Sequence, residues 1–199
     1  MKSINVKNVR LAKVNITQNE DGSKEFIFGT PELVAGVMKI SHVPTSSEAE
    51  MYEDGKVTEN ISQIVGHSLA MDFGCVPRKW LAYINGLTYE GGVMSDDGPC
   101  TPGAFAMGYE VERIKSGKTY KELTWFIHCQ AKPIERTYEQ RKKDISISND
   151  TVNITAFKDE EFNDRAYVSI DTEDKEVTED MITNFFKKVQ TNRTITATD

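Results

Sequence analysis

The sequence predicts a mainly β fold with two helices, a β-sandwich or barrel that carries an amphipathic helix at its C-terminal end. Short segments in which every second residue is apolar recur along the 199 residues, as expected of strands with one buried face. Clusters rich in Gly, Asp and Asn separate these segments, which is typical of all-β proteins. We expect one β domain over residues 1–190, with a protruding hairpin at about 47–60, and a polar tail over 191–199.

In the N-terminal half, residues 6–17 predict a first strand with a bulge, and residues 26–28 predict a short second strand. A half-buried strand is expected from Met38 to about Ser46, and another at 68–73, where polar and apolar residues alternate most regularly. Between them, Asp54 and Gly55 form a strong hairpin-turn signal. The residues flanking this turn are therefore expected to form two extended arms.

In the C-terminal half, Pro77 and Gly86 bracket a short predicted helix. A loop is expected over 85–103, either irregular throughout or with a small hairpin in it. The alternation from Phe105 to Cys129, interrupted by a turn at 114–118, predicts a larger hairpin. Further strands are expected at 145–147, 152–155 and 166–170.

The terminal helix is predicted from Thr178, a good N-cap residue, with acids in its first turn and Lys187 and Lys188 in its last. Its apolar face follows helical spacing and consists of Ile182, Phe185, Phe186 and Val189.

Alternation along the strands predicts two chemically different faces. The apolar face, expected in the core, consists of Met38, Ile40, Leu69, Met71, Phe73, Phe105, Met107, Tyr109, Val111, Leu123, Trp125 and Ile127. The opposite face carries Lys39, Ser41, Asp72, Glu110, Glu112, Glu122 and Thr124. A one-residue slip in register would bury the carboxylates, which is unfavourable.

The chain is acidic, with a formal net charge of −7 and a pI of about 5.1. This balance argues against a surface that holds nucleic-acid phosphates, but not against a surface along which DNA passes without binding. Acids gather at 48–59 and 159–180, and a basic run holds Lys132, Arg136, Arg141, Lys142 and Lys143. These regions predict either complementary contacts between copies or ordinary solvated loops.

The sequence predicts no catalytic or cofactor site. The three histidines are far apart in sequence and lie in strand patterns, and no metalloprotease, nucleophile-elbow or phosphate-loop motif occurs. Cys75, Cys100 and Cys129 form no metal or redox motif and suit a reducing compartment. The N-terminus lacks the apolar region of a signal peptide, and no apolar run could cross a membrane. We expect a structural or binding protein made in the cytoplasm, neither an enzyme nor a membrane protein.

Several segments resemble the major tail tube protein of long-tailed phages of Gram-positive bacteria. The first match is Gly29-Thr30-Pro31 with Leu33, Gly36 and Ile40, followed by Tyr52, Asp54 and Gly55 in the acidic hairpin. The strand at 104–109, Lys132-Pro133, the segment 144–148 and the Phe185-Phe186 pair are similar too. The resemblance spans nearly the whole chain, but its motifs are loose and structural. Phe28 replaces the usual tyrosine of the family, and nothing after Val189 matches.

The resemblance implies hexameric rings that stack into a hollow tail tube, through which genomic DNA leaves the virion. It implies other tail proteins as partners: the tape measure, the terminator and the distal tail protein. Under this reading the polar face defined above lines the lumen, since an acidic lining repels DNA phosphates. The arm between copies would include Glu48, Glu50, Met51, Tyr52, Glu53 and Asp54, and the basic run would be its acceptor.

Two other functions fit the same sequence. One is a ligand-binding β-barrel with an inward pocket. The other is the tube protein of a phage-derived bacteriocin or injection particle. Rings or tubes in the electron microscope would exclude the ligand-binding barrel, whereas a monomer with bound ligand would favour it.

Overall fold

The computed structural model describes residues 2–53, 56–135, 149–192 and 195, and the backbone alone for residues 50–53 and 56–60. Among these residues the predicted mainly β fold with two helices is confirmed. A nine-stranded sheet, antiparallel throughout, has the strand order β2-β1-β8-β9-β10-β5-β4, with β3 beside β1 and β11 beside β9. Its strands are β1 (Lys2–Gln18), β2 (Lys24–Phe28), β3 (Glu32–Leu33), β4 (Val37–Glu53), β5 (Lys56–Phe73), β8 (Phe105–Lys115), β9 (Lys118–Ala131), β10 (Asp150–Phe157) and β11 (Tyr167–Asp171).

The remaining elements are short. Helix α1 (Arg78–Asn85) starts after Pro77 and ends at Gly86, whose φ of 69° suits glycine at a helix C-terminus. Within the loop expected over 85–103, β6 (Thr88–Glu90) and β7 (Val93–Ser95) form a small hairpin. A 3₁₀ turn, η1 (Glu160–Phe162), precedes β11, and α2 (Glu179–Asn184) follows it.

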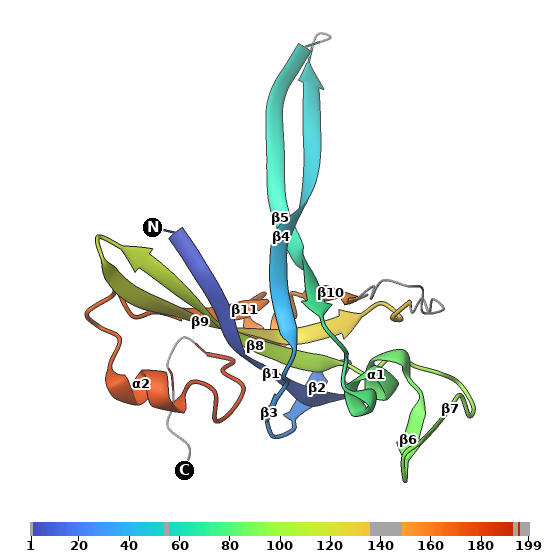
Figure 1. The fold of residues 1–199 in the computed structure, drawn as a ribbon. Helices are drawn as coiled ribbons and strands as arrows, with labels where there is room; N and C mark the ends of the chain where they lie inside the picture. The colour runs from blue at the N-terminus through green and yellow to red at the C-terminus, as the bar shows by residue number, and fades with distance from the viewer. Residues whose placement is uncertain (1, 54–55, 136–148, 193–194, 196–199) are drawn as a thin grey trace, which may run out of the picture.

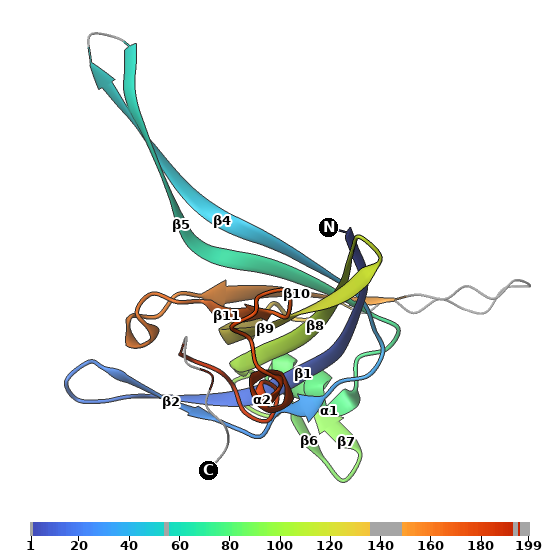
Figure 2. The same cartoon turned by 90° about the vertical axis from the view of Figure 1, so that its left-hand side faces the viewer.

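Strands β4 and β5 form a long hairpin that stands away from the rest of the molecule (Figures 1 and 2). The two strands pair with each other from Val37–Phe73 to Glu53–Lys56. Only the sheet-proximal part of β5, from Gly66 to Phe73, also pairs with β10. We call the distal part, residues 43–53 and 56–65, the arm. It starts earlier in the chain than the hairpin predicted at 47–60.

Two apolar cores lie on opposite faces of the sheet. On one face, Trp80, Leu81 and Ile84 of α1 pack against strand residues that include Phe105 and Met107. On the other face, Leu123 and Trp125 pack against the chain after β11, including Phe185, Phe186 and Val189. The central strands β8 and β9 are therefore covered on both faces, whereas the sequence predicted a core on one face alone.

A bulge in β9 explains the second core. Phe105 lies opposite Cys129, but Met107 lies opposite Phe126, so one extra residue of β9 is accommodated between these pairs. The extra residue reverses the alternation, and Leu123 and Trp125 face away from Cys129. The prediction that Leu123 and Trp125 share a face with Phe105 and Met107 is therefore wrong.

Three further expectations need correction. Met38 is 57% exposed and not in the core, because it is the extra residue at a register shift between Val37 and Lys39. Helix α2 keeps the Thr178 cap, whose hydroxyl accepts a bond from the Met181 backbone N–H, but it ends at Asn184. Phe185, Phe186 and Val189 are buried beyond it, and Lys187 and Lys188 lie outside it.

The C-terminal segment is anchored more than a polar tail would be. The Trp125 Nε1–H donates to the Phe185 carbonyl at 2.8 Å, and Arg165 donates to the Thr191 carbonyl at 2.7 Å. Ile195 packs against the second core.

Among the described residues, no helix has the length and apolar character needed to cross a bilayer. The strand expected at 145–147 lies outside the described residues.

Candidate assembly surface

The predicted lumen residues do not lie on one face of the sheet. Residues opposite each other in an antiparallel pair point to the same side, and Glu110 lies opposite Leu123 whereas Val111 lies opposite Glu122. Glu110 and Glu112 are therefore on the face of the second core. Glu122 and Thr124 are on the other face, and the prediction that all four share one face is wrong. The sequence carries no clear signal for the bulge that separates them.

Glu110 is a buried carboxylate, not a free lining residue. Its side chain is only 4% exposed and accepts a bond from the Asn8 side chain at 2.9 Å. Lys121 approaches it to 3.3 Å and Lys7 to 3.7 Å. The two ammonium groups compensate the charge that burial would otherwise penalise.

Glu112 lies at the solvent-exposed edge of the same cluster. It accepts bonds from Lys7 at 2.5 Å and from Asn5 at 3.1 Å. The bond from Lys7 lowers the pKa of Glu112 below its usual value, and the same bond raises the pKa of Lys7. This carboxylate is engaged within its own chain.

On the opposite face, Glu122 pairs with Arg113 and accepts a bond from Ser169 at 3.3 Å. The Thr124 hydroxyl is buried and lies 3.0 Å from that of Ser169. Burial raises the pKa of the neighbouring Tyr109 to about 12. Neither Glu122 nor Thr124 therefore presents an unpaired polar group.

The remaining three predicted lumen residues do share a face. Lys39 lies opposite Asp72, and Ser41 lies opposite Ala70. The Thr151 hydroxyl donates to the Asp72 carboxylate at 2.8 Å. The same face of β10 and β5 carries exposed polar side chains that sequence reasoning missed: Ser68, Thr151, Asn153 and Thr155. We call these residues, with Lys39, Ser41 and Asp72, the polar sheet face. Their hydrophilic alternation was visible in the sequence, but only the pairing of β10 with β5 brings them together.

The arm exposes apolar side chains on a hairpin that no other described part of the chain covers. Val43 is 60% exposed, Val65 52%, Ile61 51% and Ile64 44%. Glu48 is exposed too, and Glu50, Met51, Tyr52 and Glu53 lie in the paired strands, described by backbone alone. Asp54 lies outside the described residues. Four exposed apolar side chains on one hairpin make the arm a candidate surface for contact with another molecule.

Two strand edges beside the arm, those of β4 and of the first residues of β1, have no further strand paired to them among the described residues. Among the described residues, β4 pairs with β5 alone, and residues 2–7 of β1 pair with β8 alone. A groove of about 370 Å³ lies between these two edges, lined by residues that include Ile4, Val6, Met38 and Ile40. Unpaired N–H and C=O groups along such edges can bond a further strand.

The predicted basic acceptor is described in part. Lys132 is exposed, and its backbone N–H donates to the Asn153 carbonyl at 2.9 Å. Arg136, Arg141, Lys142 and Lys143 lie outside the described residues.

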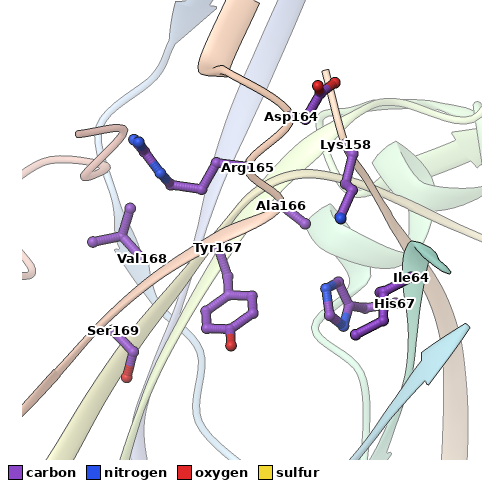
Figure 3. Close-up of a pocket in the computed structure, with 9 residues that line it drawn as sticks. All are labelled: Ile64, His67, Lys158, Asp164, Arg165, Ala166, Tyr167, Val168 and Ser169. Carbon is purple, nitrogen blue, oxygen red and sulfur yellow. The ribbon is translucent and has the colours of Figure 1, made fainter. Parts of the chain in front are cut away.

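Two of the three histidines, distant in sequence, meet where the arm joins the sheet. The distance from His42 Nε2 to His67 Nδ1 is 2.8 Å, within hydrogen-bonding range. His67 also lines a pocket of about 550 Å³ beside Lys158 and Tyr167 (Figure 3). Burial lowers the pKa of both histidines below the usual value. The third, His128, bonds to the buried Asp159 at 2.7 Å.

The described residues include no group of three or more His, Cys, Asp or Glu side chains that could hold a metal ion. A comparison of the chain with protein-family models finds no match, and a search among curated proteins finds none either.

Proposed function

We propose that this protein is a structural subunit that assembles with copies of itself, as rings stacked into a tail tube that conducts DNA from a virion. The observation that carries the proposal is the arm, a two-stranded hairpin with four apolar side chains between 44% and 60% exposed. A lone two-stranded hairpin is at best marginally stable in water, so contacts with a second copy would stabilise it.

The open edges of β1 and β4 support the same proposal. An edge strand invites pairing with another chain unless something covers it. In a closed ring each copy supplies the strand that its neighbour lacks, and repetition removes the edges. The polar sheet face is then the candidate lumen surface, in place of the carboxylates of β8 and β9. Tape measure, terminator and distal tail proteins would be its partners in a virion.

The test is assembly of the purified protein, followed by light scattering and negative-stain electron microscopy. We expect rings or tubes, and slow polymerisation as the concentration rises. A variant in which Glu48, Glu50 and Glu53 become Lys should stay folded by circular dichroism and assemble less. A monomer at every concentration tested would contradict the proposal, and a monomer with a bound ligand would favour a ligand-binding barrel.

A further inference from the structure

Two histidines join the strands of the arm where they reach the sheet. His42 lies at the end of the sheet-proximal part of β4, and His67 lies diagonally across from it on β5. One hydrogen bond connects His42 Nε2 to His67 Nδ1 at 2.8 Å. Beyond this pair, toward the tip, every described side chain of the arm is exposed.

The histidine pair also contacts the body of the molecule. Phe126 of β9 packs against the rings of His42 and His67, with centroid distances of 5.2 and 5.9 Å. Tyr167 of β11 packs against both rings as well, at 6.1 and 5.3 Å. These contacts hold the root of the arm on two strands to which the arm is not hydrogen-bonded.

A β-bulge lies directly beside the pair. The register of β4 and β5 shifts between Thr45 and Ser46, so that Thr45 lies opposite Gly66 and Ser46 opposite Ile64. A bulge bends the strand that carries it and interrupts the ladder of hydrogen bonds. The arm therefore leaves the sheet at a bend that the histidine pair adjoins.

The hydrogen bond between two imidazoles depends on their protonation. The neutral pair has one N–H and one lone pair between the rings. A first proton can occupy an outer nitrogen and leave the bond intact. A second proton occupies the remaining lone pair, so that two N–H groups of two cations would face each other at 2.8 Å. That arrangement cannot persist.

The charged groups around the two histidines favour separation of the two rings in acid. Lys158 points toward His67, whereas the carboxylate of Asp164 points away from it (Figure 3). Arg165 lines the same pocket, and Lys39 lines the groove beside His42. The other titratable groups that face the pair are the phenols of Tyr109 on β8 and Tyr167 on β11.

We propose that the His42–His67 pair is an acid-sensitive latch, whose double protonation releases the root of the arm from Phe126 and Tyr167 while the body stays folded. The proposal concerns a single chain and does not rest on the proposed assembly.

The direction of the pH dependence follows from the lowered pKa of each histidine. Burial is the main cause for both, and the charges of His42 and Lys158 add to it for His67. Release of the arm removes this burial, so the released state binds the protons first, and the latch weakens as the pH falls through and below about 6.5.

The test measures a distance within one chain. Spin labels are placed at Gln63→Cys on the arm and Asn153→Cys on β10, both exposed positions, after Cys75→Ser and Cys100→Ser. Cys129 is kept because it is buried. Labelled protein is diluted in an excess of unlabelled protein, so that distances between copies do not contribute.

We expect a narrow distance distribution at about pH 8 and a broad one at about pH 4.5, reversibly and with unchanged near-ultraviolet circular dichroism. His42→Gln, which cannot form a doubly protonated pair, should show little change with pH. His128→Gln is the matched control, because that histidine bonds to Asp159 and packs against Phe26 and Phe157, and it should respond like the parent protein.

Three results would overturn the latch. One is a distribution that stays narrow at a pH where the NMR signals of His42 and His67 report both rings protonated. Another is broadening of His42→Gln to the same extent as the parent. The last is loss of the near-ultraviolet signal at the pH of broadening, which would mean acid unfolding of the whole chain.

Discussion

At the scale of single residues, Glu110 shows most clearly that a strand pattern predicts the orientation of a side chain without predicting its surroundings. Alternation identifies it as polar and opposite to Met107 and Tyr109, and that orientation is correct. Its environment is set by Lys7 of β1 and Lys121 of β9, which approach its carboxylate in a buried position. At Glu110, alternation thus predicts which way the side chain points, but not what covers that side.

The first prediction concerns this buried carboxylate. Glu110→Lys should destabilise the fold by about 3 kcal/mol, because a third ammonium would be buried beside Lys7 and Lys121. Glu112→Lys, at the exposed edge of the cluster, should cost clearly less. Urea midpoints of the two variants measure the difference, and equal midpoints would show that Glu110 is not the buried member.

The second prediction compares two glycines, Gly108 of β8 and Gly74 in the connection from β5 to α1. A Cβ at Gly108 would lie 2.9 Å from ring atoms of Trp125, which is fully buried and cannot move aside. Gly108→Ala should therefore cost about 1–3 kcal/mol of unfolding free energy. Gly74→Ala is the matched control, since its nearest neighbour would be the Met38 sulfur at 3.9 Å. A Gly108→Ala variant as stable as Gly74→Ala would contradict the close packing of Trp125.

At the scale of elements, the hairpin β4–β5 was the most predictable feature. Its turn signal lies between the end of β4 at Glu53 and the start of β5 at Lys56. The pattern did not predict the length of this hairpin. Strand β4 already starts at Val37, and β5 ends only at Phe73. The sheet-proximal half of this hairpin is a structural part of the sheet, and only the arm extends from it.

The third prediction separates the two parts of this hairpin. Deleting residues 48–59 leaves Ser47 paired with Gln63 and joins them through residues 60–62, a common hairpin loop length. The subunit should stay folded, with a change in unfolding free energy below about 1 kcal/mol, because exposed residues contribute little to the core. Assembly, measured by light scattering, should be lost. Loss of the folded circular dichroism spectrum would instead make the arm part of the fold.

At the scale of the whole molecule, charge bears on the proposed passage of DNA through a tube of this protein. The chain carries a net charge of −7, and the polar sheet face consists mainly of neutral side chains with Lys39 and Asp72 opposite each other. Such a surface offers few cations to phosphates, and without them there is little counterion release to favour binding.

The fourth prediction is that assembled protein does not retain duplex DNA, even at about 50 mM salt, where phosphate contacts are much stronger than at physiological salt. Co-sedimentation of tubes with labelled duplex measures this directly. A variant with Ser41→Lys and Thr155→Lys on the polar sheet face should retain DNA in a salt-dependent way if that face lines the lumen. Retention by the parent protein would contradict the neutral lining, and no gain by the variant would place this face elsewhere.

The sequence by itself determined the fold class, the short helix between Pro77 and Gly86, the cap at Thr178 and the presence, but not the length, of the hairpin β4–β5, because local propensity and alternation are properties of neighbouring residues. The tertiary structure alone decided the rest. The bulge in β9 divided the expected lumen residues between two faces, and the chain after Asn184 covered one of those faces with Phe185 and Phe186. It also brought His42 and His67 within hydrogen-bonding distance. Each of these depends on register between strands far apart in the chain, where one residue more or less reverses the direction in which every following side chain points.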